Sequence, residues 1–272
     1  MVSYKEFLAK FTFKPERAFM VGVERECFLR QVGSGIIQDQ AAAVHALMEA
    51  SPYARHFSPE LSACQYEYKT DPLAISDLGE QLELLEATLQ QQLAEIGLYG
   101  DFTEVAEETM PLTVYPNSRY LKIVDTLPTE VLSAACRVAG THVHVGMPNL
   151  ATAIMIYNHI RDRVRQLREL GDHSNGARLR LYEVVAPQFD PPLVAGERGL
   201  YKLALERGFA QNPRDWWSEM RITIYGTIEF RSFGSTPSVP EIEKWARFCR
   251  QLCLDARESI SRELNRGWCW GI

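Results

Sequence analysis

The sequence predicts an α+β fold in which helices cover one face of an antiparallel or mixed β-sheet, while charged side chains occupy the other face. Segments with strand and helix character alternate along the chain without a regular strand–helix–strand rhythm. The patterns GxGxxG and GxxxxGK[ST], which mark Rossmann and P-loop domains, are absent. Several strand segments place polar residues at alternate positions with apolar residues between them, so each strand has one polar face and one core face.

Hydrophobic periodicity and turn residues locate the elements. We expect strands over 19–30, 64–70, 98–106, 137–147 and 220–233. We expect helices over 40–50, 77–97, 150–171 and 240–265. The second helix has the clearest pattern, because leucines recur every three or four residues after a candidate N-cap at Asp77. Asn149 can cap the third helix, Pro240 marks the start of the fourth, and the Gly-, Asn- and Pro-containing stretch 172–200 is expected to be rich in loops.

Composition indicates a globular protein with one domain over 1–272, because no repeat, low-complexity tract or long linker divides the chain. The net charge of -6 disfavours nucleic acid as a partner. Basic residues do gather between 161 and 180, but acidic residues dilute them, which is typical of a solvated helix face. The N-terminus lacks the features of a signal peptide and no apolar run approaches the length of a membrane span, so we expect a cytoplasmic protein without a membrane partner.

Six cysteines lack a CxxC pair or a regular spacing, which predicts reduced, buried thiols. The chain ends in the apolar segment Trp268-Cys269-Trp270. Either the chain's own domain or a second copy, in a homo-oligomer, would cover this segment.

Acidic residues occur in three of four segments that carry candidate site residues. Glu24 and Glu26 share one face of the first strand. Such a pair alone usually faces solvent, but its apolar flanks indicate a central strand. Glu60 and Glu67 are individually compatible with surface positions. Glu229 could simply form an ion pair with a neighbouring arginine.

Histidines and arginines give these acids a chemical context. His142 and His144 share one face of an apolar strand between two glycines, which favours metal or phosphate binding over a structural role. Arg221 and Arg231 supply planar guanidinium groups that bind carboxylate or phosphate through two hydrogen bonds.

Together these residues predict a nucleotide site. Carboxylates that point into one volume would repel each other unless cations lay between them. Mg²⁺ prefers carboxylate oxygens and bridges the phosphates of ATP, and arginines stabilise the charge that moves in phosphoryl transfer. The serine-hydrolase pattern GxSxG is absent, and the acid pair of a glycosidase would leave the histidines and arginines without a role.

Four motifs follow one another in a characteristic order. They are Gly22-Val23-Glu24-Arg25-Glu26-Cys27-Phe28, Glu60-Leu61 through Glu67 and Thr70, Gly140-Thr141-His142-Val143-His144-Val145-Gly146, and Tyr225-Gly226-Thr227-Ile228-Glu229-Phe230-Arg231. In order and spacing they resemble the motifs of the glutamate–cysteine ligase type 2, or carboxylate–amine ligase, family. The resemblance covers about 20–235, whereas the segment 172–199 departs from the family's usual pattern.

The resemblance implies a fold similar to the catalytic domain of glutamine synthetase, with ATP and two Mg²⁺ ions as cofactors and Mn²⁺ as an alternative metal. It implies one metal site at Glu24, His142 and Glu229. It implies a second metal site at Glu26, Glu60 and Glu67. By the same resemblance, His144 and Arg221 would contact the nucleotide phosphates, and Arg231 would contact the transferred phosphoryl group or the acyl phosphate.

The expected function is therefore an ATP-dependent ligase that joins a carboxylate, glutamate by resemblance, to an amine such as cysteine through an acyl phosphate. Both substrates are small molecules. Two alternatives stay open: a small-molecule kinase that forms no amide, and a non-catalytic sensor of ATP or glutamate with the same fold. The retention of Glu24, Glu26, Glu67, His142, Glu229 and Arg231 argues against the sensor. The sequence does not specify the amine.

Overall fold

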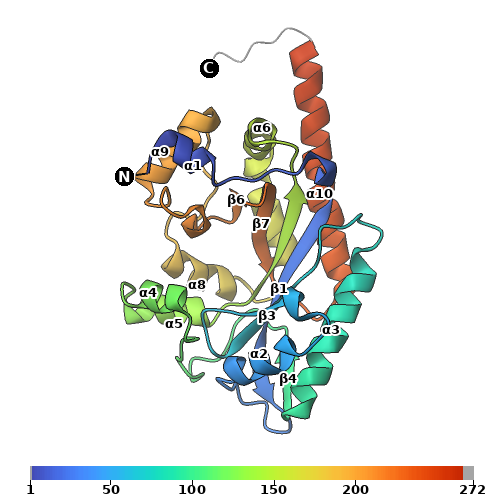
Figure 1. Cartoon of the computed structure of the whole chain (residues 1–272), viewed down its shortest axis with the longest axis vertical. Coiled ribbons are helices and arrows are strands. Elements are labelled where there is room, and N and C mark those ends of the chain that lie inside the picture. Colours follow the sequence, from blue (N-terminus) through green and yellow to red (C-terminus); the bar gives the residue numbers. More distant parts are fainter. Residues whose placement is uncertain (1, 266–272) are drawn as a thin grey trace.

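The computed structural model describes residues 2–265 and contains one antiparallel sheet of seven strands in this part of the chain (Figure 1). The strands are β1 (Val21–Gln31), β2 (Phe57–Pro59), β3 (Gln65–Lys69), β4 (Leu98–Asp101), β5 (Gly140–Gly146), β6 (Met220–Ile222) and β7 (Thr227–Gly234). Their order is β2-β3-β1-β5-β7-β6, and β4 pairs with β1.

Strand β1 organises the sheet because its 11 residues pair with β3, β4 and β5. Val21 and Val23 are buried, whereas Glu24 and Glu26 on the opposite face are half-buried. Successive side chains of a strand point to opposite faces of the sheet. A strand with one face in the core therefore alternates between buried and more exposed residues.

The long helices cover the apolar face of the sheet. They are α3 (Leu78–Glu95), α6 (Leu150–Ile160), α7 (Val164–Gly171) and α10 (Val239–Asn265), with α2 (Ala41–Glu49) beside α3. Figure 1 shows α3 and α10 along one side of the sheet. The leucine stripe of α3 is fully buried, and α10 packs on β1, β5 and α6, so both helices complete the main hydrophobic core.

The other helices lie elsewhere. α4 (Ser118–Val124), α5 (Thr129–Cys136) and α8 (Ala177–Val185) stand apart from α3 and α10, across the sheet from them (Figure 1). α5 packs on α8. Near the N-terminus, α1 (Tyr4–Leu8) packs on α9 (Gly196–Glu206).

The predicted α+β class with an antiparallel sheet is confirmed, and so are most of its elements. Asn149 caps α6 as expected, accepting a hydrogen bond from the Thr152 amide at 2.8 Å. Asp77 precedes α3 but makes no side-chain cap hydrogen bond. The expected strand 98–106 is shorter, because only Leu98–Asp101 pairs with β1.

Three segments differ from expectation. The predicted helix 150–171 is interrupted by a 3₁₀ turn at Arg161–Arg163. The predicted strand 220–233 is a hairpin, since Gly226 adopts a φ of 75° that reverses the chain between β6 and β7. The segment 172–200, predicted to be rich in loops, also contains α8 and the start of α9.

Two smaller expectations can be compared with residues 2–265. The five cysteines in this range are buried and unpaired, whereas Cys269 and the rest of the Trp268–Trp270 segment lie outside the described residues. No described helix combines the length and apolar character needed to cross a lipid bilayer.

Candidate functional site

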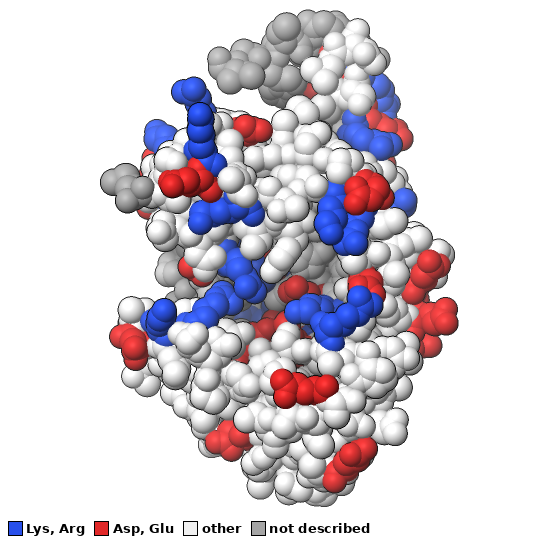
Figure 2. Space-filling view, viewed as in Figure 1, with Lys and Arg blue, Asp and Glu red and all other residues white. Residues whose placement is uncertain are grey.

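A cavity of about 770 Å³ opens on the polar face of the sheet. Figure 2 shows this hollow, with acidic side chains inside it and basic side chains on both sides of its mouth. Residues from all four sequence motifs line the cavity. They are Glu24, Glu26, Glu60, Glu67, His142, His144, Arg221 and Arg231. Glu229, the remaining predicted residue, is fully buried among them, so the fold brings all nine predicted residues together.

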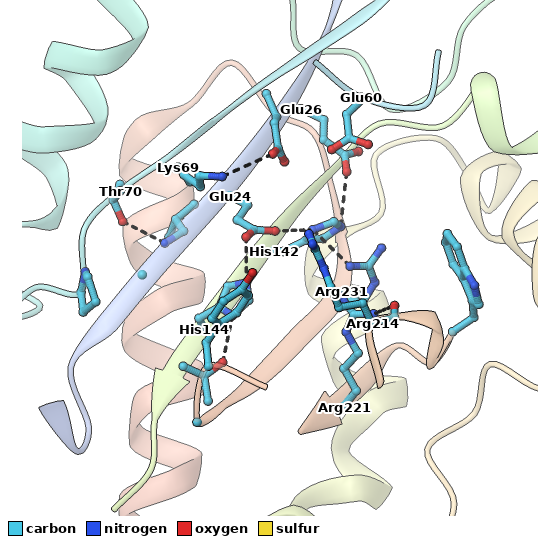
Figure 3. Close-up of a pocket in the computed structure, with 18 of the residues that line it drawn as sticks. Glu24, Glu26, Glu60, Lys69, Thr70, His142, His144, Arg214, Arg221 and Arg231 are labelled. Atoms are coloured by element: carbon cyan, nitrogen blue, oxygen red, sulfur yellow. Dashed lines mark hydrogen bonds and ion pairs between the residues drawn. The ribbon is translucent and has the colours of Figure 1, made fainter. Parts of the chain in front are cut away.

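The pairing of residues across neighbouring strands positions the side chains on the floor of the cavity. Glu24 of β1 lies opposite His142 of β5, and His144 lies opposite Glu229 of β7. The Glu24 carboxylate lies between the two histidines, with its oxygens 3.5 Å from His142 Nδ1 and 3.6 Å from His144 Nε2 (Figure 3). Adjacent antiparallel strands therefore convert three separate motifs into one cluster.

One trio in this cluster has the spacing of a cation site. Ligand atoms of Glu24, His144 and Glu229 all lie within 4.8 Å of one another. The sequence-based set has His142 in place of His144. His142 Nδ1 nevertheless lies 3.9 Å from Glu229 Oε1.

The two histidines differ in their pKa values, and one of them has a ring nitrogen without a hydrogen-bond partner. Burial, followed by the charge of Arg231, lowers the pKa of His142 to about 4, so the ring is neutral near pH 7. Burial opposes a charge on His144 as well, but the Glu24 carboxylate outweighs it and raises that pKa. His144 Nδ1 bonds the Thr227 hydroxyl at 3.0 Å, whereas its buried Nε2 has no hydrogen-bond partner and lies beside Glu24. An orphaned buried nitrogen of this kind is what a metal or a polar ligand would satisfy.

Two arginines hold Glu229. Its Oε1 accepts hydrogen bonds from Arg231 at 2.5 Å and from Arg221 at 3.2 Å, and its Oε2 accepts another from Arg221. Burial alone would raise the pKa of Glu229, but the charges of Arg221 and Arg231 outweigh it and lower the pKa well below its usual range. Glu229 is therefore a permanent anion that orients both guanidinium groups toward the cavity.

A second acidic group lies further along β1. Glu26 faces Glu67 across the β1–β3 pairing, and Glu60 lies close enough to raise the pKa of Glu67. Burial, then repulsion by Glu60, raises the pKa of Glu67 well above its usual range, and burial, then repulsion by Glu26, raises that of Glu60 to about 7. The Glu26 carboxylate accepts a hydrogen bond from the Gly140 amide at 2.7 Å, but burial still raises its pKa to about 7.

The charge of Arg231 partly offsets that of Glu26, but Glu67 has little cationic compensation. The Lys69 ammonium lies 4.0 Å from Glu67 Oε1, at the limit of an ion pair. Three crowded carboxylates with raised pKa values form a donor set that suits a divalent cation, because the cation would offset both their burial and their repulsion. The residues present thus fit Mg²⁺.

The sequence motifs missed the basic residues at the cavity mouth. Lys14, Arg17, Lys69, Arg119 and Arg214 line the cavity. Lys69 lies within the second motif, whereas the other four lie in segments without a recognisable pattern, so their positions depend on tertiary structure.

The basic cluster 161–180 also needs correction. Its expected role as a solvated face is wrong for Arg178, which is buried and donates hydrogen bonds to the carbonyls of Ala139, Ser232 and Arg231 at 3.2, 3.3 and 3.1 Å. It is also wrong for Arg168, which binds Glu219. Arg178 fixes α8 against β5 and β7 and thereby supports the wall of the site.

No family model matches the chain. Two curated relatives match it at low identity. "Putative glutamate--cysteine ligase 2-1" of Rhodococcus jostii is 28% identical over 171 residues, which are 58% of this chain and 42% of that protein. "Putative glutamate--cysteine ligase 2" of Gloeobacter violaceus is 26% identical over 251 residues, which are 85% of this chain and 66% of that protein. The chain spans less than two thirds of the length of either relative.

A solved structure shares the fold. A bifunctional glutathione synthetase from Pasteurella multocida superposes with a TM-score of 0.60 at 14% identity, over 93% of this chain and 39% of that chain. At this identity the similarity concerns the fold alone. With the names of the two relatives, the resemblance indicated by the four motifs is confirmed: the chain resembles the glutamate–cysteine ligases of type 2.

Proposed function

We propose that the chain is an ATP-dependent carboxylate–amine ligase, which phosphorylates a carboxylate and then joins it to an amine. The glutamate carboxylate and an amine such as cysteine are the substrates that the resemblance suggests. One observation carries the proposal. A single cavity combines crowded carboxylates, a neutral histidine and two arginines held by a buried anion, which together suit a metal-bound triphosphate. Residues 1–272 would act as one catalytic domain.

Under this proposal the acids divide into two metal sites. Glu24, Glu229 and one of the two histidines would hold one Mg²⁺, and the second acidic group would hold another. Bound Mg²⁺ would neutralise phosphate charge during transfer.

The arginines would stabilise the phosphoryl group directly. Arg231 donates to Glu229 through Nη1 and to the Tyr182 hydroxyl through Nε at 3.3 Å, so its guanidinium is fixed before substrate arrives. Arg221 is fixed in the same way by Glu229 and by the carbonyls of Arg214 and Trp216. Donors oriented in advance stabilise developing charge without a reorganisation cost.

The test is ADP and phosphate release from ATP and Mg²⁺, with glutamate and a panel of amines, and with mass spectrometry of the product. We expect ADP and phosphate release that requires both glutamate and one amine, and we expect mass spectrometry to detect the amide. ADP release without any amine dependence would instead identify a kinase. Tight ATP binding with no turnover would identify a sensor.

A matched pair of variants tests the site. Glu24→Gln should abolish ADP formation, because the amide removes the charge that faces both histidines. Glu83→Gln makes the same change on the exposed side of α3 and should leave turnover unaltered. Full turnover in a folded Glu24→Gln protein would refute the role of this cluster.

A further inference from the structure

An apolar wall forms one end of the cavity. The wall consists of Tyr120, Ile123, Leu127, Val131 and Ala135, with Val185 from α8. The first five follow one another at intervals of three or four residues through α4, its link to α5, and α5 itself. This spacing places them on one continuous face, although two separate helices contribute it.

An adjacent face of α5 is already used for packing. Leu132 and Cys136 are buried in a small hydrophobic cluster with Phe28 and Ile37. The wall residues are only half-buried and belong to none of the hydrophobic clusters formed by the described residues. They present apolar surface to the cavity, and such surface is stabilised when an apolar ligand covers it.

The wall lies at the acidic end of the site. The Tyr120 hydroxyl donates a hydrogen bond to the Pro59 carbonyl at 3.3 Å, next to Glu60. The charges of Glu60 and Glu67 raise the pKa of Tyr120 after burial has done so, which places the ring beside these carboxylates. A ligand on the wall would therefore have its polar end among acids.

The other end of the cavity has opposite chemistry. Thr12, Lys14 and Arg17 line it beside Gly146 and Gly226, at the far end of β5 from Gly140. Seven residues of β5 separate the two ends, roughly 20 Å of extended chain. A triphosphate is favoured at the basic end, which leaves the end with the apolar wall for the other substrates.

We propose that the apolar wall binds the carbon skeleton of the acceptor amine, so that the preferred acceptors carry a branched aliphatic or aromatic group. This inference rests on the proposed ligase function. The hydrocarbon part covers Ile123, Leu127 and Val131, and the amine nitrogen points away from the wall into the cavity, where Glu26, Glu60 and Glu67 would hold Mg²⁺. Arg119 lines the same cavity beside the wall, so an acceptor with a carboxylate has a guanidinium within the site.

The experiment compares acceptors and variants. Steady-state ADP release is measured with leucine and phenylalanine, with isopentylamine and 2-phenylethylamine as carboxylate-free counterparts, and with cysteine and glycine as small acceptors. We expect the apolar acceptors to have the higher kcat/KM. The comparison between leucine and isopentylamine shows whether the acceptor is an amino acid or a simple amine.

Leu127→Ala removes part of the wall and should lower kcat/KM for the apolar acceptors roughly 10-fold, while the KM for ATP stays unchanged. Leu121→Ala is the matched control, because Leu121 lies on α4 but is exposed and outside the cavity. A rise in the KM for ATP in Leu127→Ala would show that the wall binds the nucleotide base and would overturn the inference. A preference for cysteine or glycine would overturn it as well.

A binding measurement separates this inference from the proposed function. Isothermal titration of leucine and isopentylamine into the protein with a non-hydrolysable ATP analogue does not depend on turnover. Saturable binding that Leu127→Ala weakens supports the wall even if no acceptor yields ADP, in which case the ligase proposal fails alone. Absence of binding by both apolar amines refutes the inference.

Discussion

At the residue scale, the site is dominated by one buried anion. Glu229 has no exposed surface, yet both of its oxygens accept hydrogen bonds from arginines. Burying such a carboxylate is unfavourable unless charged donors surround it, and Arg221 and Arg231 provide these donors. The same hydrogen bonds hold the two guanidinium groups in place. The arginines therefore stabilise the buried carboxylate, and the carboxylate orients the arginines.

The geometry of Arg231 gives a prediction. Arg231→Lys keeps the charge but loses the planar fork that contacts Glu229 and Tyr182 together, and a lysine cannot replace both contacts while it also binds a phosphoryl oxygen. We expect kcat for ADP release to fall roughly 100-fold, as for loss of one oriented donor. Arg55→Lys on the exposed surface is the control. Wild-type kcat in Arg231→Lys would show that this guanidinium does not act on the transferred group.

At the element scale, a second buried arginine joins three parts of the fold on the core side of β1. Arg25 donates hydrogen bonds to Glu86 of α3 at 2.5 Å, to the Thr236 carbonyl before α10 at 2.5 Å, and to the Tyr68 hydroxyl of β3. Its guanidinium carbon lies 3.5 Å from the centre of the Phe102 ring. Arg25 thus attaches the two long helices to the strand that carries Glu24 and Glu26.

Removal of the acidic partner of Arg25 should destabilise the protein. Glu86→Ala leaves a fully buried guanidinium without its counter-ion, which should lower the free energy of unfolding by about 3 kcal/mol. Glu83→Ala, on the exposed face of the same helix, should change it by less than about 0.5 kcal/mol. Urea denaturation measures both values. Equal stability of the two variants would mean that Tyr68 and Thr236 satisfy Arg25 without Glu86.

The elements also show what sequence periodicity can and cannot predict. The leucine stripe of α3 was predicted because it is long and uninterrupted, and it is entirely buried. The stripe from Tyr120 to Ala135 has similar spacing, but Pro128 divides it into two short helices, and it faces a cavity instead of the core. α8 was missed because its buried residues include Arg178, a charged side chain that periodicity assigns to solvent.

At the scale of the whole molecule, the fold brings together residues that are more than 200 positions apart in the sequence, from Glu24 to Glu229. Alternation along β1, β5 and β7 was sufficient to predict which side chains share the polar face. The register between neighbouring strands was not readable from the chain, and it determines that His144, not His142, forms the close trio with Glu24 and Glu229. Which of these residues meet at one cavity was therefore predictable, whereas their pairing was not.

The summed charge of this site predicts how Mg²⁺ affects stability. Glu26 and Glu60 have pKa values of about 7 in the folded protein, above the usual 4.5, so their contribution to stability is complete below about pH 4.5 and is lost as pH rises through 7. His142, with its pKa lowered to about 4, acts in the opposite direction, but its effect is complete above about pH 6.5. Without metal, the acids therefore determine the trend between about pH 6.5 and pH 8, and the melting temperature should fall.

Mg²⁺ should reverse this trend, because it binds the deprotonated carboxylates and its binding releases their protons. The increase in melting temperature on adding Mg²⁺ should therefore be larger at about pH 8 than at about pH 6, as thermal denaturation with and without the ion would show. A sodium salt of equal ionic strength controls for screening. Glu60→Gln removes one of the titrating acids and should reduce the pH dependence of the increase. The same increase at both pH values would indicate that Mg²⁺ does not bind at Glu26, Glu60 and Glu67.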